Sequence, residues 1–151
     1  MSPLFGLSAM PAFSGYNTLM TDLEKAREFF GGDLYATETT GIVIEEVGDH
    51  YARCSMEITR KHQNAYGGVM GGATFTLADY TFAVASNFNQ PQTVSVTSQI
   101  NFIGMAKGTK LISESRLIKD GRSTCLYEID ITDDLGTKIA FVTISGMKLG
   151  K

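Results

Sequence analysis

The segment that decides the fold runs from His62 to Asn87 and reads HQNAYGGVMGGATFTLADYTFAVASN. A glycine-rich turn leads directly into an apolar stretch, Ala73 to Asn87, that is long enough for four turns of helix. Because this stretch has no polar face, we expect a helix that is buried within the domain. Asp79 is the carboxylate inside it, and an ionised Asp is rarely buried without a partner. Asp79 is therefore the first candidate for a functional residue.

The region before this segment predicts an irregular arm and one short helix. Residues 1–20 hold two of the three prolines and show no periodicity. Thr21 to Phe30 reads as a helix in which Thr21 and Glu24 form a capping box, and Gly31-Gly32 ends it. We therefore treat residues 1–33 as an N-terminal arm with a short helix.

Period-two patterns surround the apolar helix. From Leu34 to Ile58 the period is two, with strands GIVIEEV and YARCSMEI joined by a turn at Gly48-Asp49. After Pro91 come four more strand candidates, which are TVSVTSQINFI, LISESRLIKD, TCLYEIDITD and KIAFVTISGMKL. The order of helix, two strands, buried helix and four strands favours an α+β domain with an antiparallel sheet curved around a central helix.

Size and charge limit the function. The chain has 151 residues, of which 43% are apolar, so residues 1–151 are expected to form a single domain that folds without disulfides or a metal. The net charge is -3 and the basic residues are scattered, which argues against nucleic acid as a partner. Cys54 and Cys125 are expected to be buried thiols, and His50 and His62 to lie on the surface. No His, Cys and carboxylate cluster has metal-ligand spacing.

The N-terminal sequence MSPLFGLSAMPAF has no basic region and no long apolar run. It does not read as a signal peptide, and no uncharged apolar run approaches the ~20 residues that span a bilayer. We therefore expect a soluble, cytoplasmic protein with no membrane partner.

Three motifs resemble those of a known family. They are Asn64-x-x-Gly67, then Gly71-Gly72, then Leu77-Ala78-Asp79, and their order and spacing resemble the hotdog-fold acyl-CoA thioesterases of the phenylacetate-pathway (PaaI-like) type. The resemblance extends through strand-like segments at 99–108 and 120–146 and covers roughly 35–148. It implies a six-stranded antiparallel sheet around one helix, assembly as dimers and often tetramers, and hydrolysis of acyl-CoA thioesters. Coenzyme A is then part of the substrate, and no separate cofactor is expected.

The resemblance also implies roles for particular residues. Asp79 matches the catalytic carboxylate, Gly71 the residue whose backbone N–H binds the thioester oxygen, and Asn64 the amide that helps to place the reacting groups. The family commonly has His just before the double glycine, and this chain has Met70 there. Further candidates for substrate binding extend from the glycine turn to the strand at 93–103 and the turn after it: Met70, Gly72, Ser95, Thr97, Lys107 and Lys110.

The spacing of two of these residues predicts the oligomeric state. Gly71 and Asp79 are eight residues apart on one helix, which separates them by roughly 12 Å along its axis. An attacking oxygen must lie about 3 Å from the carbonyl carbon, so one chain can hardly supply both groups to one substrate. Two helices that lie antiparallel about a twofold axis can. We therefore expect a homodimer in which each site takes Gly71 and Asn64 from one subunit and Asp79 from the other, with a homotetramer left open.

Several alternatives remain open from the sequence. Asp79 acts either as the base that activates water or as a nucleophile, or it is a structural Asp bonded to Thr76 or to the backbone. Because Met70 replaces the usual His, a non-catalytic module that binds acyl-CoA or another acyl ligand is the second interpretation. A hotdog dehydratase or hydratase ranks last, since those enzymes use an Asp–His pair on or near the helix and this helix has no His. The sequence does not single out an acyl group, and small aromatic and short or medium chains all remain.

Overall fold

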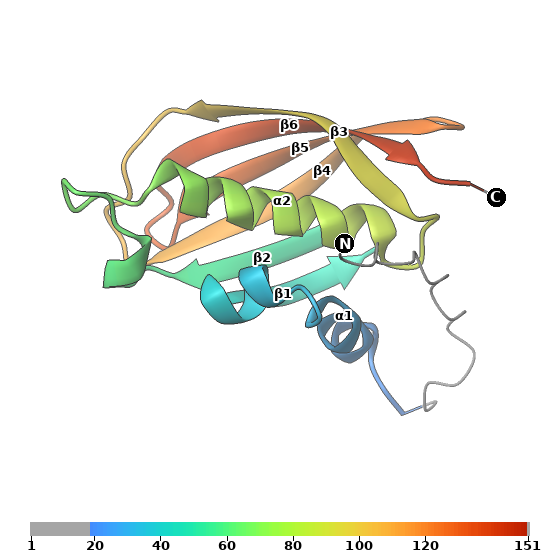
Figure 1. Ribbon diagram of the computed structural model, residues 1–151, viewed down its shortest axis with the longest axis horizontal. Coiled ribbons are helices and arrows are strands. Elements are labelled where there is room, and N and C mark those ends of the chain that lie inside the picture. The colour runs from blue at the N-terminus through green and yellow to red at the C-terminus, as the bar shows by residue number, and fades with distance from the viewer. Residues whose placement is uncertain (1–18, 151) are drawn as a thin grey trace, which may run out of the picture.

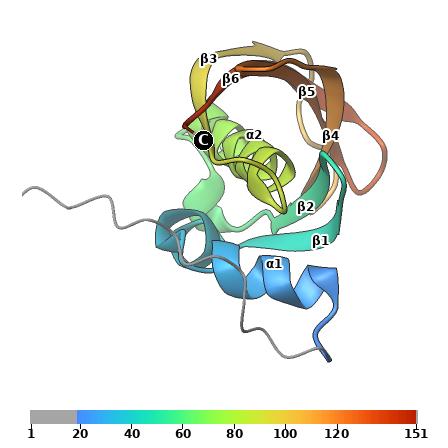
Figure 2. The same ribbon diagram turned by 90° about the vertical axis from the view of Figure 1, so that its right-hand side faces the viewer.

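The protein is a six-stranded antiparallel sheet that curls around one long helix, as the computed structural model of residues 19–150 shows (Figure 1). The strand order is β1-β2-β4-β5-β6-β3. The helices and strands have these bounds: α1 Asp22–Phe30, β1 Ile42–Gly48, β2 Tyr51–Glu57, α2 Gly71–Asn87, β3 Thr93–Phe102, β4 Lys110–Asp120, β5 Thr124–Asp133 and β6 Lys138–Lys148. A view along α2 shows the strands forming an arc around it, with α1 outside the sheet beneath β1 (Figure 2). The predicted α+β hotdog fold is confirmed.

The short N-terminal helix forms where the capping box predicted it. The Thr21 hydroxyl accepts a hydrogen bond from the Glu24 N–H at 3.2 Å, and the Glu24 carboxylate accepts one from the Thr21 N–H at 2.7 Å. Arg27 then ties α1 to the outside of the sheet by donating to the carbonyl of Ile44 at 2.8 Å. Most of the predicted arm, residues 1–18, lies outside the residues that the structure describes.

The strand pattern predicted from Leu34 onward is wrong at its start. Tyr35–Thr39 is a short π-helix, and β1 begins only at Ile42. The Thr40 N–H and hydroxyl both donate to the carbonyl of Tyr35, and this i to i+5 bond defines the wide turn. Gly41 follows with a φ of 77°, a left-handed conformation that glycine adopts without a Cβ clash. The local hydrogen bonds of Thr40 and the turn at Gly41 therefore favour a helix here, although the sequence alternates with a period of two.

The core lies between α2 and the concave face of the sheet. Leu77, Ala78, Val84 and Ala85 are fully buried on α2. They face buried residues of the strands that include Met56, Leu111, Ile129, Val142 and Ile144. Each fully buried large aliphatic side chain stabilises the fold by about 1.5–3 kcal/mol. The small residues on α2 let the strands approach closely. The apolar residues that alternate along the strands and the apolar residues of α2 therefore pack into one core.

One side of α2 stays uncovered, which corrects the expectation of a helix buried all round. Gly72, Thr76, Asp79 and Ala83 follow one another along a helical stripe, and all are exposed or half-buried. The neighbouring edge strand β3 is exposed from Val94 to Gln99. An edge strand offers unpaired N–H and C=O groups to another chain. The open stripe of α2 and the β3 edge therefore leave one side of the subunit available for a partner.

Both cysteines are buried free thiols, as predicted, with Cys54 in β2 and Cys125 in β5. Burial raises the pKa of the Cys54 thiol to about 12, which keeps it protonated and unreactive at neutral pH. Within residues 19–150, no helix is both long enough and apolar enough to span a bilayer.

The packing of Gly146 on β6 gives a test of the fold. A Cβ at this position would lie 2.7 Å from Thr93 Cγ2, 2.8 Å from Cys125 Sγ and 2.9 Å from Phe82 Cζ. We expect Gly146→Ala to lower the free energy of unfolding by about 1–3 kcal/mol, because three packed side chains must move. Chemical denaturation measures this change. Gly48→Ala is the matched control, since its Cβ meets only ordinary contacts at 3.8 Å; equal stability of the two variants would contradict the packing described.

Candidate active site

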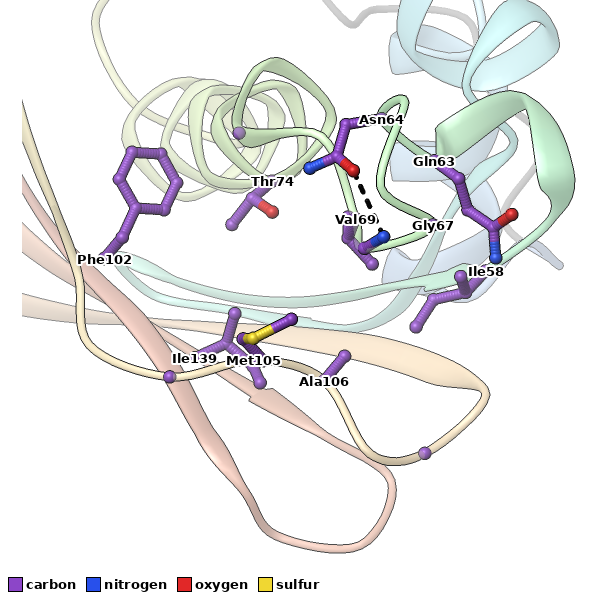
Figure 3. A pocket seen from close by; sticks show the side chains of 14 residues that line it. Ile58, Gln63, Asn64, Gly67, Val69, Thr74, Phe102, Met105, Ala106 and Ile139 are labelled. Atoms are coloured by element: carbon purple, nitrogen blue, oxygen red, sulfur yellow. Dashed lines mark hydrogen bonds between the residues drawn. The ribbon is translucent and has the colours of Figure 1, made fainter.

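A cavity of about 490 Å³ lies at the N-terminal end of α2 (Figure 3). The loop after β2, the first turn of α2 and the segment after β3 form its walls. Asn64 and Gly71, two of the predicted site residues, both line it. Phe102, Met105 and Thr74 supply apolar and hydroxyl surface on the other sides. The structure therefore brings the predicted oxygen-binding residues together around one hollow.

The first two N–H groups of α2, those of Gly71 and Gly72, have no hydrogen-bond partner among the described residues. Met70 is the N-cap, and its side chain makes no capping hydrogen bond. Its carbonyl accepts from the N–H groups of Ala73 and Thr74, but among the described residues nothing accepts from Gly71 or Gly72. These two N–H groups also carry the positive end of the helix dipole. A polar residue at the cap would compete for such N–H groups, so Met70 leaves the helix start open to a ligand oxygen.

Asn64 shapes the loop and presents its amide to the cavity. Its side-chain oxygen accepts from the N–H of Tyr66 at 2.9 Å and of Gly68 at 3.2 Å, the latter drawn in Figure 3. Gly67 has a φ of 85°, which closes the turn. Within the described part of the chain, Nδ2 of Asn64 has no hydrogen-bond partner. The amide orientation that satisfies the two backbone donors thus leaves two N–H bonds for a substrate.

His62 is buried, which corrects its predicted place on the surface. Its Nδ1 accepts from the Thr59 N–H at 2.9 Å, so its Nε2 carries the proton and donates to the Thr40 carbonyl at 2.7 Å. The His62 carbonyl in turn accepts from the Met70 N–H at 2.8 Å. His62 therefore fixes the start of α2 against the end of the π-helix. Thr40 is 22 residues away in sequence, and no local pattern points to this contact.

The other histidine is likewise less exposed than expected. His50 is half-buried in the turn between β1 and β2, and its Nδ1 lies 2.7 Å from the hydroxyl oxygen of Tyr127 on β5. This contact also joins residues far apart in sequence.

Asp79 lies in a second cavity, of about 330 Å³, on the open stripe of α2. It is exposed in the single subunit and makes no hydrogen bond to any described residue. The Thr76 hydroxyl donates to the Gly72 carbonyl at 2.8 Å instead, so Asp79 has no structural bond to Thr76. The loss of hydration in this pocket raises the pKa of Asp79, and the nearby Asp33 carboxylate raises it further. Asp79 is a carboxylate without a structural task in the subunit.

The two cavities share no lining residue. Gly71 is the first residue of α2 and Asp79 the ninth, so the helix itself holds them about 12 Å apart. One subunit therefore does not place the free N–H groups and the carboxylate around one small group.

The remaining predicted binding residues are placed as follows. Met70 and Gly72 are exposed at the start of α2, beside the first cavity. Ser95 and Thr97 are exposed on the β3 edge, on either side of a bulge, and neither bonds Asp79 within the subunit.

The two lysine candidates differ in their surroundings. Lys107 is exposed between Ala106 and Gly108, which line the first cavity. Lys110 is ion-paired with Glu57 at 3.2 Å, and it lines a separate hollow with Glu45 and Glu46. Lys107 therefore lies on a segment that borders the first cavity without lining it, and Lys110 lies at a separate hollow.

Sequence reasoning missed Asp133, which holds a wall of that cavity. This buried carboxylate accepts from the N–H groups of Lys107, Gly108, Leu135 and Thr137 at 2.8–3.0 Å. Burial raises the pKa of Asp133, but the N–H donors outweigh it and hold the pKa well below its usual range. The signal in the sequence was an Asp at the end of a strand before a Gly turn, which many solvated loops share.

The comparisons with known proteins agree with this geometry. The family model described as "Thioesterase superfamily" matches residues 66–140. The chain is similar to this superfamily over about half of its length. It is 26% identical over 129 residues to the acyl-coenzyme A thioesterase PaaI of Escherichia coli, covering 84% of the chain and 91% of PaaI. The solved PaaI structure superposes with a TM-score of 0.74 at 22% identity, over 85% of the chain and 96% of PaaI, and shares the fold. The chain is thus a PaaI-like hotdog protein.

Two further relatives extend the comparison. A putative esterase of Archaeoglobus fulgidus is 31% identical over 98 residues, and the match spans 64% of each protein. The structure of smu.793 from Streptococcus mutans, bound to acetyl CoA, has a TM-score of 0.69 at 26% identity. It covers 73% of the chain and 90% of smu.793.

The bonds of Asp133 predict a dependence of stability on pH. Because its pKa in the folded protein is depressed, its contribution is present above the unfolded pKa of about 3.9 and is lost as pH falls toward the folded pKa. We expect Asp133→Asn to be less stable than wild type at pH 7, since an amide NH₂ must face backbone N–H donors. The difference should shrink as the pH falls below 4. Thermal unfolding at several pH values measures it, and a difference that is constant with pH would contradict this role.

Proposed function

We propose that this protein is an acyl-CoA thioesterase that hydrolyses small aromatic or short to medium-chain acyl-CoA. The observation that carries the proposal is the pair of free N–H groups at Gly71 and Gly72, which open beside Asn64 onto a cavity. The match to the thioesterase superfamily model and the likeness to PaaI support the reaction class. The structural relative that holds acetyl CoA supports the substrate class.

The N-terminus of α2 would stabilise the transition state. As a nucleophile adds to the thioester carbon, negative charge develops on the carbonyl oxygen. The Gly71 N–H donates to this oxygen, and the helix dipole favours the charge. Loss of one such donor typically costs about 3–4 kcal/mol of transition-state stabilisation. Nδ2 of Asn64, which has no hydrogen-bond partner among residues 19–150, donates to the substrate or to water and keeps the thioester in place.

Asp79 supplies the base or the nucleophile. As a base, it takes a proton from the attacking water, and the CoA thiolate leaves when the tetrahedral intermediate collapses. As a nucleophile, its oxygen attacks the thioester carbon, CoA leaves, and water hydrolyses the resulting anhydride. Both routes need an ionised carboxylate, and both end with a free acid and CoA.

Each active site would form between two subunits. Two copies that pair their β3 edges lay the open stripes of α2 side by side and antiparallel. Gly71 and Asn64 of one subunit then meet Asp79 of the partner subunit, which resolves the separation of about 12 Å within one helix. Ser95 and Thr97 lie on this edge, within reach of the joined site. A dimer is the smallest assembly that meets these demands, and a tetramer of two such dimers meets them too.

The mouth of the first cavity would hold the CoA portion. Lys107 is exposed there, and its ammonium would face the phosphates of CoA. Met70 and Gly72 border the path to the oxygen-binding N–H groups. Lys110 has a smaller part in binding, because Glu57 already pairs with it.

Met70 favours a second candidate function. Where the family commonly has His, this chain offers a thioether that neither moves protons nor donates hydrogen bonds. A hotdog protein that binds acyl-CoA without turnover would keep the cavity and the Gly71 N–H and lose rate. The reaction proposed above uses backbone donors at this point, so it does not depend on that side chain.

Free-thiol release from a panel of phenylacetyl, benzoyl, short-chain and medium-chain CoA esters tests the function. We expect turnover by the wild type and a loss of about 10²–10⁴-fold in kcat for Asp79→Ala. Asp130→Ala is the control, because Asp130 is exposed on β5 and lines neither of these two cavities. Binding of CoA esters without turnover by the wild type would reject hydrolysis and support the binding module.

Mixed dimers test the shared site. Asn64→Ala and Asp79→Ala are each expected to be inactive, but a mixed dimer of the two keeps one site with both wild-type residues. Unfolding and refolding equal amounts together should therefore restore about a quarter of wild-type activity. A mixture of Asp79→Ala and Asp79→Asn is the control and should stay inactive. A fully active monomer, or no restoration in the mixture, would reject a site built from two subunits.

A further inference from the structure

A second carboxylate shares the cavity of Asp79. Asp33, two residues before the π-helix, lines this cavity with Asp79 of α2. Around the two acids lie Leu34, Tyr35, Thr76 and Ala83, which give the cavity an apolar and hydroxyl surface. In the proposed reaction the thioester carbon sits at Asp79, so the acyl group extends into this same space.

The position of Asp33 is fixed by its backbone. Its N–H donates to the Phe30 carbonyl at 3.1 Å, and its carbonyl accepts from the N–H of Thr37 at 3.0 Å. Tyr80 of α2 donates its hydroxyl proton to the same Phe30 carbonyl at 3.2 Å, which ties this corner to the central helix. The Asp33 carboxylate itself has no hydrogen bond or ion pair with any described residue. The chain therefore holds a bare carboxylate at the wall of the cavity.

No described cation neutralises this pair of acids. The cavity lining contains no Lys, Arg or His, and its other titratable groups are the phenols of Tyr35 and Tyr80. On the adjacent helix α1, Arg27 donates to the Ile44 carbonyl, and Lys25 pairs with Asp22 at 3.5 Å. Cys54, which adjoins Tyr80 from β2, stays protonated because burial raises its pKa to about 12. The carboxylates of Asp33 and Asp79 therefore repel each other, and no described cation offsets this repulsion.

We propose that Asp33 is a specificity-determining residue that excludes acyl groups carrying a carboxylate and that sets the acid limit of Asp79. The inference rests on the proposed thioesterase function. A fixed negative charge in the acyl space repels a second one on the substrate, and a neutral chain meets only the apolar lining. The same charge disfavours ionisation of Asp79, since two nearby carboxylates resist being charged together.

The directions of the two pKa shifts agree with this role. Loss of hydration raises the pKa of Asp33, and loss of hydration together with the Asp33 charge raises the pKa of Asp79. Asp79 must be ionised to act, so a raised pKa moves the acid limb of the activity profile to higher pH. Removal of the Asp33 charge lowers the pKa of Asp79 and moves this limb to lower pH.

Hexanoyl-CoA and adipoyl-CoA form a matched pair of substrates, because they have the same chain length and differ by one terminal carboxylate. We expect the wild type to prefer hexanoyl-CoA. Asp33→Asn should raise kcat/KM for adipoyl-CoA relative to hexanoyl-CoA by about five- to tenfold. In the same variant, the acid limb of kcat/KM for hexanoyl-CoA should move to lower pH.

Two controls separate this role from a structural one. Glu38→Gln removes one unit of charge from the π-helix that follows Asp33, at an exposed position outside the cavity, and should change neither readout. Asp33→Glu keeps the charge and should retain both the preference and the acid limb. Thermal unfolding checks that the variants fold. If Asp33→Asn does not fold, Asp33→Ser removes the same charge and replaces it in the test.

The outcomes distinguish this inference from the function on which it rests. No turnover of either thioester by the wild type would overturn the proposed function, and with it the role of Asp33. Turnover of hexanoyl-CoA with an unchanged substrate ratio and acid limb in Asp33→Asn would overturn only the role of Asp33. An equal response of Glu38→Gln would also overturn it, since net charge rather than position would then be the cause.

Discussion

The curved sheet encloses α2, and this packing positions every other part of the subunit (Figure 2). The apolar faces of five neighbouring strands and of α2 leave water together, which is the largest favourable term in a fold of this size. The first turn of the enclosed helix therefore lies at the rim of the sheet. Backbone N–H groups at that end cannot find partners within the helix. The fold therefore creates a site for a ligand oxygen as a by-product of burying its core.

The incomplete enclosure matters as much. Six strands cover only part of the circumference of α2, and the last strand in the order, β3, ends as an exposed edge. The uncovered stripe is where Asp79 lies, so the carboxylate avoids the full cost of burial in the core. Open helix and open edge lie on the same side of the subunit. The open side of α2 and β3 therefore leaves a single subunit incomplete, and it also presents Asp79 to a second subunit.

The site also depends on polar contacts that join distant parts of the chain. His62 connects the end of the π-helix to the start of α2, and Asp133 holds the loop at Lys107 and Gly108 through backbone donors. Neither residue has a chemical role in the proposed reaction. Each satisfies backbone groups that would otherwise be unpaired at the cavity walls. The cavity is therefore shaped by buried polar residues that act on the main chain.

The order of elements, the strand turns, the capping box of α1 and the start of α2 near Gly71 could all be predicted from local sequence, because periodicity and capping act over a few residues. The sequence also singled out Asp79 and Asn64 by motif. The sequence did not predict that Tyr35–Thr39 is a π-helix, that His62 is buried or that Asp33 lies beside Asp79. These outcomes depend on contacts between residues far apart in sequence, and such contacts form only once the sheet has closed around the helix.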